Sequence, residues 1–168
     1  MKVHGHDLRG RGAGPAGALV LVTLAMSTAI GCDRAGGTPV SVSDSFICEQ
    51  TAAGTETMSG DLHQYRGVTM RCQHDSASDP RIRGVQESEV SIDLRPDRSA
   101  DMWGTYRLTN VDGSWEGNWT GTVAAGYSTH AMDGVASGTG SYAGLQLSYH
   151  VTGDGRYFTL TGTISPTP

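Results

Sequence analysis

The sequence predicts an all-β fold, a single small antiparallel β-barrel of about eight strands, preceded by a signal peptide and a flexible tether. After residue 45, short runs alternate apolar and polar residues, and no stretch shows a convincing helical period. Turn-forming residues return roughly every ten positions and separate these runs. The chain also contains 24 glycines, many of them inside the alternating runs. Because glycine lets a strand bend or approach a neighbour closely, this abundance favours a closed barrel over an open sandwich.

The first half of the predicted domain contains two clear half-buried strands. In residues 67–74 the apolar side chains occupy every second position, and residues 87–96 repeat the pattern. Residues 75–84 lie between them and are rich in turn formers, so they are predicted as a loop. The inward-facing residues of these two strands are expected to be Val68, Met70, Cys72, Val90, Ile92 and Leu94.

The second half is predicted to form two hairpins. Residues 102–123 contain two alternating runs that meet at Asp112-Gly113, a dipeptide that supplies the positive φ angles of a tight turn. Residues 145–164 form a second hairpin around residues 153–155. The expected inward set is Trp115, Gly117, Trp119, Gly121, Val123, Leu145, Leu147, Tyr149, Val151, Phe158, Leu160, Gly162 and Ile164. In the Trp-x-Gly-x-Trp-x-Gly run, the glycines are expected to make room for the indole rings.

Residues 1–31 are predicted to be a secretory signal peptide. The first fifteen residues carry three basic side chains and one acid, and residues 16–30 carry no charge. This apolar run is shorter than the roughly 20 residues needed to span a bilayer, so cleavage is favoured over insertion.

Cys32 follows this segment and is the predicted site of lipidation. Small residues at Ala29 and Gly31 suit ordinary signal cleavage, while Gly-Cys at the cut resembles the lipobox of bacterial lipoproteins, from which Ala29 departs. The polar residues 32–45 are predicted to tether the acylated cysteine to a barrel domain at residues 46–166. We therefore expect an extracytoplasmic protein that is anchored to the bacterial cell membrane, with simple secretion as the alternative.

Cysteine parity supports this assignment. The chain has 3 cysteines, and an odd cysteine in a secreted protein needs an explanation. Lipidation of Cys32 would leave Cys48 and Cys72, which both lie in strand-like runs, to form a disulfide in an oxidising compartment. Two buried free thiols are the alternative.

Charge and motifs exclude several functions. Beyond residue 31 there are 9 basic and 16 acidic residues, a formal charge of −7, so no nucleic-acid partner is expected. The four histidines beyond residue 31, His63, His74, His130 and His150, show no metal-binding spacing and are predicted to lie at the surface. No cofactor or metal is expected, and no catalytic residue can be assigned. Oligomeric state is left open.

The segment "SGTGSYAGLQLSY" (residues 137–149), followed by "LTGTISP", resembles the closing strands of the barrel shared by allene oxide cyclases and dirigent proteins. "WGTYRLTNVDGSWEGNWTG" is similar to secreted bacterial proteins of the same barrel type. The resemblance covers roughly residues 100–166 and implies an eight-stranded barrel with an apolar cavity, but transfers no catalytic residue. "GSWEGNWTG" alone gives a weaker resemblance to avidin-like barrels.

Aromatic residues are the remaining candidates for a binding function. They fall mostly on the expected inward faces, where they either fill the barrel or line a cavity for a small apolar ligand. We therefore expect a non-catalytic module for binding a small ligand or a partner, with a cyclase-like enzyme as the alternative. The candidate ligand-binding residues are Trp103, Tyr106, Trp115, Trp119, Tyr142 and Tyr149.

Overall fold

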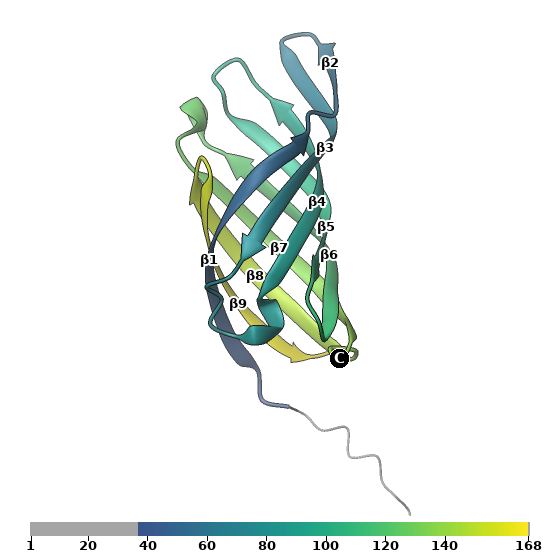
Figure 1. Cartoon of the computed structure of the whole chain (residues 1–168). Helices are drawn as coiled ribbons and strands as arrows, with labels where there is room; N and C mark the ends of the chain where they lie inside the picture. Colours follow the sequence, from purple (N-terminus) through teal and green to yellow (C-terminus); the bar gives the residue numbers. More distant parts are fainter. Residues whose placement is uncertain (1–36, 168) are drawn as a thin grey trace, which may run out of the picture. The chain divides into compact units, whose positions relative to one another are not determined.

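The computed structural model describes residues 37–167, which form a closed antiparallel β-barrel (Figure 1). The predicted signal peptide and Cys32 lie outside the described residues. The strands are β1 (Val40–Ala52), β2 (Thr55–Ser59), β3 (Leu62–His74), β4 (Gly84–Leu94), β5 (Ala100–Thr109), β6 (Gly113–Val123), β7 (His130–Gly140), β8 (Leu145–Asp154) and β9 (Tyr157–Pro166). Two 3-10 turns, η1 (Pro80–Ile82) and η2 (Ala125–Tyr127), lie in the loops.

The barrel closes through its first strand. From β3 to β9 each strand pairs with the next along the chain, and β1 completes the circle by pairing with β9 on one side and β3 on the other. β2 pairs only with β3, so it extends that strand as a hairpin at one end of the barrel (Figure 1). The closed wall therefore has eight strands, and the predicted fold class is confirmed.

The predicted boundary between tether and barrel is wrong by several residues. β1 begins at Val40, inside the segment assigned to the tether, and Val42 and Asp44 are buried in the barrel. The alternation of the strand continues backwards from Phe46 through these two residues. The small polar residues between them, which suggested a linker, face solvent on the outer surface.

One end of the barrel is closed by the loop between β3 and β4. Within this loop Asp79 caps η1 by accepting a hydrogen bond from the Arg81 backbone nitrogen at 2.9 Å. Ala77 and Ile82 of this loop are buried, and the Trp115 indole Nε1 donates to the Arg81 carbonyl at 2.8 Å. The loop was predicted correctly, but its role in filling one end of the barrel was not.

Two local features differ from the prediction. The β5–β6 connection turns at residues 110–112, where the Asn110 side chain accepts from the Asp112 and Gly113 backbone nitrogens at 3.0 and 3.3 Å. Gly113 itself begins β6 and has no positive φ. Gly117 makes room for the next strand rather than for an indole, since a Cβ there would lie 2.1 Å from the Val135 carbonyl oxygen.

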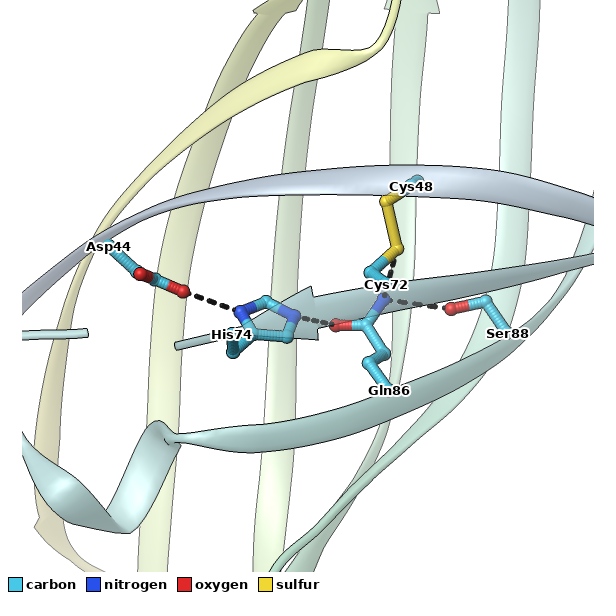
Figure 2. The surroundings of a disulfide bond; sticks show 6 residues. All are labelled: Asp44, Cys48, Cys72, His74, Gln86 and Ser88. Carbon is cyan, nitrogen blue, oxygen red and sulfur yellow. Dashed lines mark hydrogen bonds and ion pairs between the residues drawn. A yellow bond between two sulfur atoms is a disulfide. The ribbon is translucent and has the colours of Figure 1, made fainter. Parts of the chain in front are cut away.

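A disulfide crosses the closing seam between β1 and β3. Cys48 and Cys72 are directly opposed in the register of these strands, and their sulfurs are bonded (Figure 2). The predicted pairing is confirmed. The β1–β3 ladder is short and contains a bulge between Gln50 and Ala52, so the disulfide fastens the seam that completes the barrel.

Candidate ligand-binding cavity

The barrel encloses a cavity of about 270 Å³. Its walls come from all eight strands of the closed sheet, and side chains from alternate positions point into it, as a barrel wall requires. The residues that line it include Val68, Met70, Val90, Met102, Leu108, Trp119, Met132, Leu147, Val151, Phe158 and Leu160. The cavity is therefore mainly apolar and lies where the sequence placed the domain core.

The cavity is closed at one end and reaches solvent at the other. Ile82 from the loop that carries η1 forms part of its lining, and this residue exposes only 1% of its surface. At the opposite end the lining includes Gln50 near the end of β1 and Gly155 in the β8–β9 turn, both exposed. A ligand would therefore enter from the end that carries this turn.

Within the described residues 37–167, none of the cavity-lining side chains is Asp, Glu, Lys or Arg. Removing an ion from water without a partner is costly. The lining therefore favours a neutral ligand.

Tyr106 places an unpartnered hydroxyl in this lining. The residue exposes 6% of its surface, and its Oη has no hydrogen-bond partner among residues 37–167. Its ring packs edge-on against Tyr149, with centroids 5.6 Å apart. Burial raises the pKa of the Tyr106 hydroxyl. The nearby Tyr149 hydroxyl acts in the same direction, although the two groups do not meet hydrogen-bond geometry, so Tyr106 keeps its proton and can donate a hydrogen bond.

His130 contributes a second unpartnered polar atom. Its Nδ1 is buried and has no partner within the part of the chain that the structure describes. The ring packs edge-on against Phe158, with centroids 5.7 Å apart, near the solvent-accessible end of the cavity. Burial lowers the pKa of the imidazole below its ordinary value, so the neutral form is favoured near pH 7.

A chain of hydrogen bonds runs from a buried carboxylate to the cavity wall (Figure 2). Asp44 Oδ2 lies 2.6 Å from His74 Nδ1, and His74 Nε2 lies 3.1 Å from Gln86 Oε1. The amide Nε2 of Gln86 then donates to Ser88 Oγ at 2.8 Å. His74, Gln86 and Ser88 line the cavity, whereas Asp44 is buried inside the barrel and is not part of the lining. Both ring nitrogens of His74 are therefore engaged within the wall.

The structure divides the six candidate aromatic residues into three groups. Tyr106, Trp119 and Tyr149 line the cavity. Trp115 and Tyr142 stack on each other at 5.3 Å in the closed end and do not line it. Trp103 lies on the outer surface, with 38% exposure, where the Arg66 guanidinium sits 4.8 Å from its ring centroid.

The prediction that all four histidines lie at the surface is wrong for His74 and His130. His74 exposes 1% of its surface, and His130 is partly buried against the cavity at the start of β7. His63 and His150 are partly exposed and pair with Glu56 and Asp133 at 2.7 and 2.8 Å.

Sequence reasoning also missed Asp44. Extending the alternation of β1 backwards from Phe46 by two positions places Asp44 on the inward face, so the signal was present. A charged residue on an apolar face needs a buried partner, and His74 has the same inward parity as Cys72.

A comparison with protein-family models finds no match to this chain, and a comparison with curated proteins finds none either. Between residues 37 and 167, no helix is long and apolar enough to cross a membrane. The same residues contain no cluster of three or more His, Cys, Asp or Glu side chains suited to a metal ion.

Proposed function

We propose that the protein is an extracytoplasmic lipoprotein, anchored through Cys32, whose barrel binds one small apolar ligand without transforming it. The observation that carries this proposal is the apolar cavity of about 270 Å³, closed at one end by the loop around Ile82 and reaching solvent at the other. A barrel of this strand number has room either for packed side chains or for one small ligand. The size of the cavity supports the second arrangement.

Apart from His130, whose unpartnered Nδ1 lies near the solvent-accessible end of the cavity, the titratable groups of the wall favour binding over catalysis. A cyclase-like mechanism would need an acid or base that faces the ligand with a free position. Asp44 is buried and does not line the cavity, and both nitrogens of His74 are engaged, by Asp44 and by Gln86. This arrangement stabilises the buried carboxylate and leaves neither group free to exchange a proton with a ligand.

The binding function is tested by thermal unfolding of the purified barrel domain with a panel of small neutral apolar compounds. A ligand that binds only the folded state stabilises it by about 2.7 kcal/mol at a concentration one hundred times its dissociation constant. We expect a concentration-dependent rise in Tm for some compounds of the panel. A panel spanning compounds near the cavity volume that produces no rise would overturn the binding proposal.

The anchor is tested by the intact mass of the protein from the membrane fraction. We expect a chain that begins at Cys32 and carries acyl mass, and a Cys32→Ser variant that leaves this fraction. Two acyl chains on one residue supply the double hydrophobic signal that stable anchoring requires. A chain that begins at Cys32 with no added mass would instead support simple secretion.

A further inference from the structure

We infer that the ligand of the cavity is a neutral compound with one oxygen acceptor, and that Tyr106 Oη donates a hydrogen bond to that oxygen. This inference rests on the proposed binding function and adds the chemical class of the ligand. Its starting point is the Tyr106 hydroxyl, which is buried in the cavity wall and unpartnered among residues 37–167. A buried hydroxyl without a hydrogen-bond partner costs free energy, so a ligand that accepts its hydrogen bond gains affinity.

The direction of the hydrogen bond follows from the neighbouring groups. Burial keeps Tyr106 protonated, so its O–H is available as a donor. Ser88 lies opposite Tyr106 in the β4–β5 register, and its oxygen already accepts from Gln86 Nε2. A serine hydroxyl that accepts through its oxygen still has its own proton to donate. Both hydroxyls therefore suit an acceptor such as a ketone oxygen.

The wall also selects against ionised ligands. No Lys or Arg side chain lines the cavity within residues 37–167. The imidazole of His74 is occupied by Asp44 and Gln86, and burial lowers the pKa of His130, near the solvent-accessible end, which disfavours its cationic form. A carboxylate at this depth would lose its hydration without gaining a counter-charge. A ligand whose carboxylate has to lie beside Tyr106 is therefore a poor ligand, although its apolar part matches the walls.

Cavity size limits the ligand to a compact molecule. An apolar cavity of about 150 Å³ holds benzene, so a cavity of about 270 Å³ holds roughly eleven non-hydrogen atoms by proportion. Two fused six-membered rings with one ketone oxygen fit this limit. The probe 1-tetralone has this composition, and tetralin lacks only the oxygen. The probe 1-naphthoate carries a carboxylate on the fully aromatic form of the same two-ring skeleton.

The test is an NMR titration of the barrel domain with these three probes, and the tryptophan indole signals report on location. Trp119 lines the cavity, Trp103 lies on the outer surface, and Trp115 is sealed in the closed end. We expect both neutral probes to shift the Trp119 signal while the Trp103 signal stays constant. We expect 1-tetralone to bind more tightly than tetralin, and 1-naphthoate at least about tenfold more weakly than 1-tetralone.

The decisive variant is Tyr106→Phe, which removes the hydroxyl and keeps the ring. We expect it to weaken 1-tetralone by about fivefold to tenfold and to leave tetralin unchanged, because only the ketone uses the hydroxyl. Ser88→Ala is a second test of the hydrogen bond, and it should also weaken the binding of 1-tetralone but not that of tetralin. An unchanged Trp115 signal shows that each variant has kept the fold of the closed end.

The outcomes separate the two proposals. If neither neutral probe shifts Trp119 in the unmodified protein, the proposed binding function fails and the inference fails with it. If both probes bind but Tyr106→Phe affects them equally or not at all, the binding function stands and the role of Tyr106 is overturned. Binding of 1-naphthoate as tight as that of 1-tetralone would overturn the preference for a neutral ligand.

Discussion

Asp44 and His74 form a buried polar pair inside the barrel, with Oδ2 and Nδ1 2.6 Å apart and both side chains almost completely hidden from solvent. They are 30 residues apart in the chain and meet because β1 pairs with β3 to close the wall. The second carboxylate oxygen accepts from the Ser45 backbone nitrogen at 2.8 Å and from the Ser76 hydroxyl at 3.3 Å. The pair therefore joins β1, β3 and the start of the closing loop.

Replacing Asp44 by Asn should destabilise the barrel strongly. Breaking one partner of a buried pair costs about 3 to 5 kcal/mol, because the remaining partner stays buried without compensation. Urea unfolding of the disulfide-intact protein measures this loss. The matched control is Glu116→Gln, which removes an exposed pair with Arg107 at 3.3 Å and should cost less than about 1 kcal/mol. Equal losses for the two variants would contradict a structural role for the pair.

Two tyrosine hydroxyls should differ in their contribution to stability. The Tyr142 hydroxyl donates to Asn110 Oδ1 at 2.8 Å, whereas the Tyr106 hydroxyl has no partner among residues 37–167. We expect Tyr142→Phe to lower the free energy of unfolding by about 1 kcal/mol. Tyr106→Phe should leave it unchanged or raise it slightly, since it removes an unmet buried group. Thermal unfolding without ligand measures both values, and a larger loss in Tyr106→Phe than in Tyr142→Phe would show that Tyr106 has a partner.

Removing the disulfide should destabilise the protein substantially. Cys48 and Cys72 are separated by 24 residues, and closing a loop of this length stabilises by about 3.5 kcal/mol in the chain-entropy model. A Cys48→Ser, Cys72→Ser double variant should lose an amount of this order in urea unfolding. In the unmodified barrel domain, Cys48 and Cys72 should not be alkylated under denaturing conditions until a reductant has broken their disulfide. Alkylation without reductant would contradict the bond.

The fold was predictable because it depends on local alternation and turn spacing. Each inward-facing residue of β8 and β9 follows from a period of two, and the disulfide follows from counting cysteines. The same period of two also shows that two of the candidate aromatic residues cannot both face the cavity. In β5, Tyr106 and Trp103 are separated by an odd number of positions, so a regular strand cannot turn both of them inward.

The hydrogen-bond network around His74 and the cavity were harder to predict from the sequence. Alternation gives the face of a residue but not the order of strands, so it cannot bring Asp44 to His74 across the β1–β3 seam. The cavity depends on the volumes of side chains that meet from opposite walls. It also depends on the loop around Ile82, whose sequence is typical of turns and carries no sign that it folds over the barrel end.

Gly134 should control the position of a cavity-lining ring. It lies opposite Tyr149 in the β7–β8 register, and a Cβ at this position would lie 2.2 Å from the Tyr149 hydroxyl oxygen. Gly134→Ala should therefore push the Tyr149 ring into the cavity, lower stability by about 1 to 3 kcal/mol and weaken both neutral probes. Gly37→Ala is the control, because its nearest atom, Pro166 Cγ, would be 3.5 Å from the new Cβ. Equal stability and probe affinity in the two variants would contradict this role.

His130 should make the stability of the barrel fall in mildly acidic solution. Burial lowers the pKa of its imidazole in the folded state, although the Gly153 backbone and the charge of Asp154 act in the opposite direction. The unfolded chain then binds more protons than the folded chain over the interval between the two pKa values. The contribution of His130 to stability is therefore complete above its ordinary pKa of about 6.5 and is lost as the pH falls toward the lower, folded value.

Unfolding measured between about pH 7.5 and pH 5 tests this contribution, because this range covers the ordinary pKa of histidine. The His130→Gln variant should lose less stability over this range than the unmodified protein, since glutamine cannot take up the proton. His150→Gln removes an exposed histidine paired with Asp133 at 2.8 Å and serves as the matched control. Identical pH dependence in His130→Gln and the unmodified protein would mean that protonation of His130 is not linked to unfolding.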